Sequence, residues 1–200
     1  MGGCQGQTAN RQIDGLADLG AELARRLGMP VRDLWDMRNG YALCTFGGLS
    51  AIDALIDTAG EHELQALRSL LRIGLHRNIQ VTDVMDAPAH LVSQAFCAAL
   101  PVAYSDVPGA AWTRLAQLVL DAAYEATLLE GVLNARRGAS NTVFLTRLGG
   151  GAFGNDETWI HAAMVRALEL VKGYALDVRV VSYNRPGPSL RKLVAAFDSG

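Results

Sequence analysis

The sequence predicts a single domain of the α/β class. Of its 200 residues, 50% are hydrophobic and 19% are charged, and a chain of this length and composition can bury a substantial core. From Leu91 to Phe197, apolar runs of strand length alternate with segments of helical periodicity. Such alternation is typical of right-handed crossovers, which build a parallel sheet with helices on its faces.

The first third of the chain is mainly helical in its pattern. Residues 10 to 27 predict a helix that ends at Gly28 and Pro30, with the following apolar residues on one face: Ile13, Leu16, Leu19, Leu23 and Leu27. Further along, we expect a short extended segment at 34–45, helices at 49–60 and 61–71, and a strand or bent hairpin arm at 72–84. We therefore divide the chain into an N-terminal helical segment, 1–30, and an α/β region, 31–200.

The second half carries the clearer alternation. Residues 91–104 are almost continuously apolar, which predicts a strand buried on both faces, and a turn follows at 105–109. Residues 111–133 predict a long amphipathic helix, with Trp112, Leu115, Val119, Ala122, Ala126, Leu129 and Leu133 opposite Arg114, Gln117, Asp121 and Glu125. The remaining elements are strands at 142–148 and 176–183 and helices at 156–173 and 189–197.

Charge and cysteine content exclude several classes of protein. The formal net charge is −2 and no block of Lys or Arg occurs, so we expect neither a nucleic-acid nor a membrane partner. Cys4, Cys44 and Cys97 are odd in number and widely spaced, which predicts free thiols in a reducing compartment. No apolar leader or stretch of about 18 apolar residues is present, so the cytoplasm is the expected location.

The segment "GGGAFGN", residues 149–155, is the strongest candidate for a ligand site. Glycine inside a regular element costs about 0.5–1 kcal/mol relative to alanine, so this cluster indicates an irregular turn or a close approach to the main chain. It lies between the carboxyl end of a predicted strand and the next helix, where open α/β sheets bind ligands. Its N–H groups could surround a diphosphate, and Phe153 could cover a ribose or a ring.

The predicted start of the next helix limits where a phosphate can lie. Asn155 is the expected N-cap, and Asp156 and Glu157 follow it. These two acids favour the helix dipole but repel an anion on the helix axis, so a phosphate is expected over the loop amides. The alternative is a glycine-rich turn that serves only the close packing of a strand on a helix.

Several known motifs are absent from the sequence. "GGGAFG" does not fit G-x-G-x-x-G in register, and no acidic residue ends a following strand at the distance that a dinucleotide-binding fold requires. The sequence also lacks G-x-x-x-x-G-K-[ST], H-E-x-x-H and G-x-S-x-G.

The order of elements and the glycine segment resemble a macrodomain, the ADP-ribose-binding α/β fold. The resemblance covers roughly residues 91–184, and "LGGGAFGN" is similar to a divergent bacterial group in which removal of ADP-ribose from arginine is known. It implies a three-layer α/β/α fold with a mixed, largely parallel sheet. It also implies binding of ADP-ribose or an ADP-ribosylated protein through the following residues: Gly149, Gly150, Gly151, Ala152, Phe153, Gly154 and Asn155.

The activity that the resemblance implies is hydrolysis of ADP-ribose from protein side chains, without a cofactor or a metal. Two alternatives stay open: a reader that binds ADP-ribose or a nucleotide diphosphate without turnover, and a truncated structural module without a ligand. Macrodomains carry a second loop upstream, and the only candidates for it here are Asn39, Gly47 and Gly48, which match poorly. We therefore expect the first strands of the sheet and part of the active site to be missing.

Two acids are candidates for the catalytic groups. Asp106, beyond the end of the strand at 91–104, could orient a water or a guanidinium, and Asp156 could act beside the glycine segment. A turn-forming aspartate and a helix-start acid are their respective alternatives. Arg147 should emerge at the sheet edge or meet a carboxylate or a phosphate, because an unpaired buried guanidinium is costly. We expect Glu125 to be solvated, and His76 and His161 to have structural roles.

Overall fold

The computed structural model describes residues 8, 12–81 and 90–198, and it confirms a mixed α/β class. The helices are α1 (Ala17–Leu27), α2 (Val31–Leu34), α3 (Phe46–Thr58), α4 (Glu61–Arg68), α5 (Thr113–Arg136), α6 (Glu157–Val171) and α7 (Pro188–Asp198). The strands are β1 (Trp35–Arg38), β2 (Tyr41–Cys44), β3 (Gly74–Gln80), β4 (Leu91–Phe96), β5 (Thr142–Leu145) and β6 (Asp177–Val180). Two 3₁₀ turns, η1 (Val102–Tyr104) and η2 (Gly109–Trp112), lead into α5.

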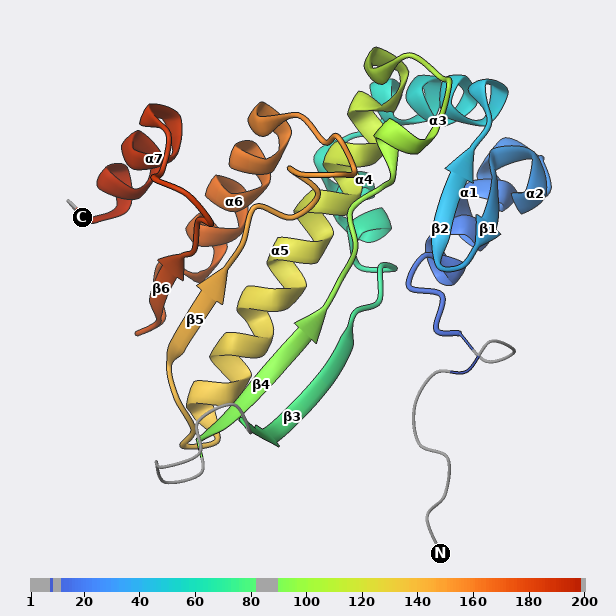
Figure 1. The fold of residues 1–200 in the computed structure, drawn as a ribbon. Coiled ribbons are helices and arrows are strands. Elements are labelled where there is room, and N and C mark those ends of the chain that lie inside the picture. Colours follow the sequence, from blue (N-terminus) through green and yellow to red (C-terminus); the bar gives the residue numbers. More distant parts are fainter. Residues whose placement is uncertain (1–7, 9–11, 82–89, 199–200) are drawn as a thin grey trace, which may run out of the picture.

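Helix α5 is the central axis of the molecule (Figure 1). Its first half, with Trp112 just before it, packs into one apolar cluster with α1, α3 and α4, and its second half packs into another with β5 and α6. Trp159 of α6 packs against both clusters. None of the helices in the described part of the chain is long and apolar enough to cross a membrane.

The long helix is confirmed, but the prediction of its faces is wrong in part. Leu129 and Leu133, expected in the core, are 43% and 53% exposed, whereas Asp121, expected on the polar face, is 4% exposed. The reason is that α4 and α6 both pack on α5, so that part of its polar face is enclosed as well.

The start of the first helix also differs from the prediction. Within the described residues α1 begins at Ala17, because Leu16 N–H donates to the Asp14 carboxylate at 2.8 Å and the chain turns there. Ile13, expected on the buried face, is 65% exposed. Residues 10 and 11 of the predicted helix lie outside the described part. The predicted end is confirmed by Gly28, whose φ is +64°.

The extended segment at 34–45 is an antiparallel hairpin of β1 and β2. Asn39 and Gly40 have φ values of +51° and +81°, and an Asn-Gly pair with two positive φ angles is typical of a tight two-residue hairpin turn. Helices α3 and α4 and strand β3 confirm the expected elements that follow, with residues 82–84 outside the described part.

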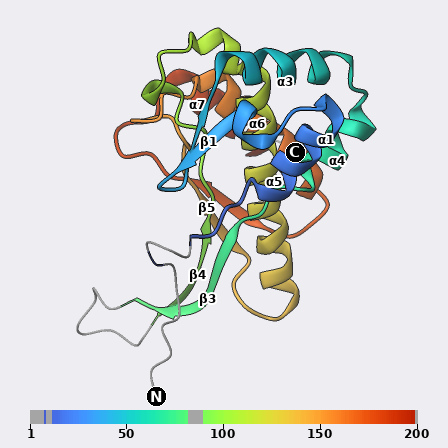
Figure 2. The same cartoon turned by 90° about the vertical axis from the view of Figure 1, so that its right-hand side faces the viewer.

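The strands form three separate pairs, not one sheet. The hairpin β1–β2 and the pair β3–β4 are antiparallel, and β5–β6 is parallel. The parallel pair agrees with the predicted crossover through α6, but a largely parallel sheet is not found in the described residues. In Figure 2, α5 lies on one side of β3, β4 and β5, and no described helix covers the other side.

Strand β4 departs most from the prediction. It was expected to be buried on both faces, but all six of its residues are exposed. The cause is that β4 pairs along one edge only, with β3, and no second layer covers it in the described structure. The other two predicted strands are confirmed but shorter, because 146–148 and 181–183 belong to the loops that follow β5 and β6.

Candidate functional site

The glycine segment lies in the loop between β5 and α6, at the carboxyl end of a parallel strand, as predicted (Figure 1). The start of this loop is fixed to α5 by Tyr124, whose hydroxyl donates to the Thr146 carbonyl at 2.7 Å and accepts from Leu148 N–H at 2.9 Å. The position of the loop is thus set by a buried side chain of the central helix.

Packing explains three of the four glycines in the loop. Gly149 and Gly154 have φ values of +75° and +70°, and a Cβ on them would lie 2.4 and 2.8 Å from the Cβ atoms of Ala99 and Ala103. A Cβ on Gly150 would lie 3.0 Å from the Ile160 side chain. Close packing, the alternative to a ligand site, therefore explains why these three positions are glycine.

Gly151 differs from the other glycines of the loop. A Cβ there would meet nothing within 4 Å, its φ is not in the left-handed region, and the residue is exposed. Neither packing nor backbone conformation therefore requires a glycine at this position. The absence of a side chain keeps the main chain open to an approaching molecule.

Three successive N–H groups of the loop, unlike the others, donate no hydrogen bond within the described part of the chain. Gly150, Gly154 and Asn155 donate their N–H groups within the loop, to the carbonyls of Arg147, Gly151 and Gly149. In contrast, the N–H groups of Gly151, Ala152 and Phe153 donate to no acceptor among the described residues. A run of consecutive free N–H groups is a typical anion-binding element of protein loops.

Asn155 closes the loop in a way that the sequence did not indicate. It was predicted as the N-cap of the next helix, but it is 5% exposed, and its amide donates to the Leu100 carbonyl at 2.8 Å. The N-cap is Asp156, whose carboxylate accepts from Thr158 N–H at 2.7 Å and from the Thr158 hydroxyl at 2.6 Å. The two bonds from Thr158 lower the pKa of Asp156.

The start of α6 is therefore negatively charged. Asp156 stays ionised at neutral pH, and Glu157 is the first residue of the helix. A second anion on the helix axis would be repelled, which leaves the loop amides as the more favourable place for one. The acidic start of α6 is thus as predicted, although the capping residue was wrong.

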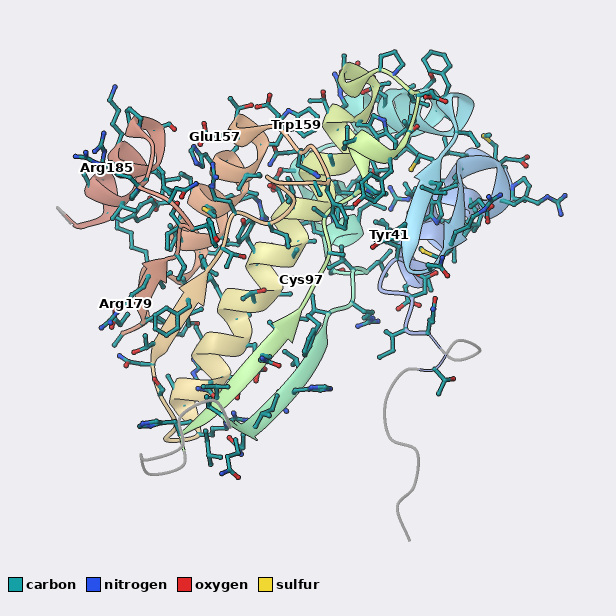
Figure 3. The ribbon with its side chains drawn as sticks, in the orientation of Figure 1. Tyr41, Cys97, Glu157, Trp159, Arg179 and Arg185 are labelled. Carbon is teal, nitrogen blue, oxygen red and sulfur yellow. The ribbon has the colours of Figure 1, made fainter. Side chains whose placement is uncertain are left out.

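Arg147 pairs with a carboxylate, which was one of the predicted possibilities. Its guanidinium lies 3.2 Å from the Glu157 carboxylate, and the side chains are 42% and 48% exposed. Glu157 also lies 3.7 Å from Nε2 of His161. Figure 3 shows Glu157 at the start of α6. A positive group is thus held at the start of the glycine loop, in contact with solvent.

Three aromatic rings meet beside the loop, and sequence reasoning found only one of them. Tyr41, Tyr104 and Phe153 pack edge to face with ring centroids 5.5 to 5.7 Å apart, and we call them the aromatic cluster. They come from β2 (Figure 3), from η1 and from the loop. The two tyrosines are 37% and 51% exposed. The Asn-Gly pair before Tyr41 indicates a hairpin turn, but it does not indicate that Tyr41 contacts Phe153.

Asp106 lies two residues after Tyr104, on the exposed turn before η2. The hydrogen bond that shapes this turn comes from Ser105, whose hydroxyl accepts from Val107 N–H at 3.1 Å. No partner of the Asp106 carboxylate is found among the described residues. The segment is held against the glycine loop by Ala103 N–H, which donates to the Phe153 carbonyl at 2.9 Å.

The three poorly matching candidates for an upstream loop have local roles in the fold. Asn39 is part of the hairpin turn, Gly47 lies in the first turn of α3, and Gly48 packs so closely on Leu34 that a Cβ would lie 2.4 Å from its carbonyl oxygen. These residues serve the local fold. The hairpin contributes Tyr41 to the site instead.

The other predicted groups lie outside the site. Glu125 was expected to be solvated, but it bonds Arg166 at 2.7 Å and Gln65 at 2.8 Å, because α4 and α6 cover that part of α5. His76 packs against Phe96, at 4.9 Å between ring centroids.

The cysteines and possible metal ligands add no reactive centre to the site. Cys44 and Cys97 are free thiols, as predicted, and burial raises the pKa of Cys44 to about 12. Cys4 lies outside the described residues. Among the residues described, no group of three or more His, Cys, Asp and Glu side chains is arranged to hold a metal ion.

A cavity of about 560 Å³ lies near the site but does not include the loop. It is bounded by residues 12–16, by the β1–β2 hairpin and by residues 96–101. Ala99 and Leu100, which line it, also contact Gly149 and Asn155. The free amides and the aromatic cluster are not part of this cavity, so we place the candidate site at the loop.

Comparisons of the chain with protein-family models, with curated proteins and with solved structures gave no match.

Proposed function

We propose that this chain is a macrodomain-like protein that binds ADP-ribose, or a related nucleotide diphosphate, at residues 149–155. The observation that carries the proposal is the run of free N–H groups from Gly151 to Phe153, at a glycine that packing does not require. Such N–H groups bind phosphate oxygens, and the carboxyl end of a parallel strand is where α/β folds bind nucleotides.

The charges around the loop support the same placement. The acidic start of α6 disfavours a phosphate on the helix axis, whereas the half-exposed Arg147 lies at the start of the loop. We therefore place the diphosphate over the amides of 151–153. The ring of Phe153 and the two tyrosines beside it would then lie against the distal ribose.

The three-layer arrangement is part of this proposal. Helices α5 and α6 supply one layer beside the strands, and β5–β6 supplies a parallel pair (Figure 1). A second helical layer would have to cover the opposite face, where the described strands are open (Figure 2).

Calorimetric titration of the full chain with ADP-ribose, AMP and NAD tests the binding. Gly151→Glu places a carboxylate among the free amides, and Gly173→Glu is the matched control, since its Cβ also meets nothing within 4 Å and it lies at the far end of α6. We expect ADP-ribose to bind the natural chain and the control alike. We expect the Gly151→Glu chain not to bind.

Three results would contradict the proposal. Equal binding by both variants would place the ligand elsewhere, and the absence of heat for a folded natural chain would favour the structural alternative. Binding of AMP as tight as that of ADP-ribose would show that the diphosphate is not recognised.

A second candidate function, hydrolysis, is favoured by the position of Asp106. This exposed carboxylate follows the segment whose Tyr104 packs on Phe153. It could accept a proton from a water whose oxygen bonds to the anomeric carbon of the distal ribose, while the bond from that carbon to the protein side chain breaks. Asp156 already caps α6, and we assign it no step in this reaction.

Release of ADP-ribose from arginine- and glutamate-modified protein tests this activity. If the natural chain has turnover, Asp106→Asn should lower it by about 10²-fold or more with little change in ADP-ribose affinity. Asp36→Asn, on the exposed hairpin, is the control. Binding without any turnover would identify the protein as a reader, and full turnover of Asp106→Asn would exclude this role for the residue.

A further inference from the structure

Residues 178–197, which lie in β6, the loop after it and α7, differ in charge from the rest of the chain. They include Arg179, Arg185, Arg191 and Lys192 and no acidic residue, so all 20 Asp and Glu residues of the chain lie elsewhere. The net charge of the whole chain is −2. The positive charge of this segment is therefore a local feature that the overall composition does not explain.

Three of these four cations have no carboxylate partner. The guanidinium of Arg179 lies 2.7 Å from the Asp177 carboxylate. In contrast, Arg185, Arg191 and Lys192 are exposed, and the side chain of none of them forms an ion pair or a hydrogen bond with another described residue. The first turn of α7 contains no acidic residue either. These three charges are therefore free to meet the carboxylates of another molecule.

The loop between β6 and α7 also exposes two apolar side chains. Val181 is 46% exposed, and Tyr183 is fully exposed, at 103%. Tyrosine and arginine are enriched among the residues that contribute most to binding between proteins, so an exposed tyrosine near unpaired cations is typical of a contact surface. We call the following residues the basic surface: Val181, Tyr183, Arg185, Arg191 and Lys192.

The basic surface lies at the same end of the molecule as the glycine loop. The loops after β5 and β6 start side by side, since Val181 N–H donates to the Leu145 carbonyl at 2.7 Å. Helix α7 also contacts α6, whose start follows the glycine loop. Figure 3 shows Arg185 beside α7, at the same end of the molecule as Glu157. A polypeptide with one side chain at the glycine loop can therefore reach the basic surface with its neighbouring residues.

We propose that the basic surface binds an acidic stretch of the polypeptide that carries the ADP-ribose. That this polypeptide is ADP-ribosylated rests on the proposed function, whereas the acidic character of the stretch rests on the unpaired cations. Complementary charges speed the encounter of two proteins and select the correct partner. The start of α6, with Asp156 and Glu157, repels the same stretch, so we place the stretch over α7 and the loop before it.

A polypeptide fits this surface better than other anionic partners. All three free cations are exposed, so none of them belongs to an enclosed pocket for a single phosphate. Anionic lipid surfaces are typically bound by clusters of roughly 4–8 Lys and Arg residues, and nucleic-acid-binding domains are usually basic as a whole. Side chains of a polypeptide can also pack on Tyr183 and Val181.

Fluorescence anisotropy of the full chain with an unmodified peptide tests the basic surface without ADP-ribose. The probe is a fluorescent repeat of Glu-Gly-Ala, and the same repeat with Gln in place of Glu is its uncharged counterpart. We expect only the acidic peptide to bind, and we expect its affinity to fall as NaCl is added, because salt screens exposed charges. Tyr183→Ala should weaken binding about fivefold.

Two charge-reversal variants show where the peptide binds. Arg185→Glu combined with Lys192→Glu should weaken binding of the acidic peptide by about tenfold or more, since two attractions become repulsions. Arg32→Glu combined with Lys172→Glu is the matched control, because these cations are also exposed and lie on α2 and at the end of α6. The control should bind the peptide like the natural chain.

Matched variants separate this proposal from the proposed function. Gly151→Glu should lose ADP-ribose and keep the acidic peptide, whereas Arg185→Glu with Lys192→Glu should keep ADP-ribose and lose the peptide. An acidic peptide that carries ADP-ribose should bind the natural chain more tightly than either part alone, because the two contacts are linked. Binding of the acidic peptide without any binding of ADP-ribose would confirm the basic surface and overturn the proposed function alone.

Equal binding of the acidic and uncharged peptides, or an equal effect of the two charge-reversal variants, would overturn the proposal. The same chains also identify other occupants, each of which would overturn it. Tighter binding of oligothymidylate or phosphatidylserine vesicles, lost on charge reversal, would identify a nucleic acid or a membrane. Stronger peptide binding by Asp83→Asn with Asp86→Asn, two positions outside the described residues, would identify a segment of this chain. A dimer in sedimentation that charge reversal dissociates would identify a second copy.

Discussion

Gly151 and Gly154 are three residues apart, yet the structure gives them different reasons to be glycine. Gly154 has a positive φ and touches Ala103, whereas Gly151 has neither constraint. Gly154→Ala should therefore lower the free energy of unfolding by about 1–3 kcal/mol, since it adds backbone strain and a clash. Gly151→Ala should change it by less than about 0.5 kcal/mol. Urea unfolding of both variants checks this contrast, and a large loss for Gly151→Ala would return that glycine to a packing role.

Because Asp156 caps α6 with its carboxylate, the free energy of unfolding depends on pH. Its pKa is lowered in the folded chain, so the stabilisation is present above the ordinary pKa of about 3.9 and is lost as pH falls through the folded value. Asp156→Ala should cost about 1 kcal/mol at pH 7, whereas Asp156→Asn keeps a good cap. Thermal unfolding from pH 3 to pH 7 should show a steeper loss at acid pH for the natural chain than for Asp156→Asn. Parallel curves would contradict this role.

At the scale of elements, local sequence signals predicted well where neighbours along the chain decide the structure. Gly28 ends α1, and helices α3 and α6 and the parallel pair β5–β6 lie where periodicity placed them. The predictions failed where distant contacts decide. β4 has the composition of a buried strand, but burial requires a covering layer, and its own residues cannot indicate that none of the described elements supplies one.

In the candidate site too, local sequence predicts one part, whereas contacts between distant residues form the other. The glycine loop is a continuous segment, and its place after a strand was predictable from residues 142–155 alone. Tyr41 and Tyr104 reach Phe153 only through the tertiary fold, so no spacing in the sequence brings them together. Asp156 caps α6 in place of Asn155, because the buried contact of Asn155 with Leu100 shifts the cap by one residue.

The contact between α4 and α5 contains a buried ion pair. Arg68 and Asp121 are 8% and 4% exposed and lie 3.2 Å apart. Burial raises the pKa of Asp121, while the bond from Gln117 and the charge of Arg68 oppose that rise. Asp121→Ala would leave the guanidinium buried with one partner fewer, and we expect a loss of about 3–5 kcal/mol in urea unfolding.

A double variant distinguishes the pair from simple packing. Arg68→Met combined with Asp121→Leu removes both charges and should be more stable than Asp121→Ala alone. Equal destabilisation by the single and double variants would show that side-chain volume, and not the charge pair, holds α4 on α5.

In the whole molecule, α5 connects two apolar clusters. The elements that pack on α5 in these clusters carry the residues of the site. One cluster positions the hairpin with Tyr41, the other positions β5 and α6, and the aromatic cluster joins the two beside the free amides. The face of the strands away from α5 is open in the described structure (Figure 2). Binding at the loop depends on the arrangement of these two clusters.

The measurement we would make first follows individual backbone amides by NMR during titration with ADP-ribose. The amides of Gly151, Ala152 and Phe153 should shift together and saturate, while that of Gly173, at the other end of α6, should not move. Inorganic phosphate should shift the same three amides more weakly. If ADP-ribose leaves these amides unchanged while others shift, or shifts none in a folded chain, the loop is not a phosphate site and the proposed function is wrong.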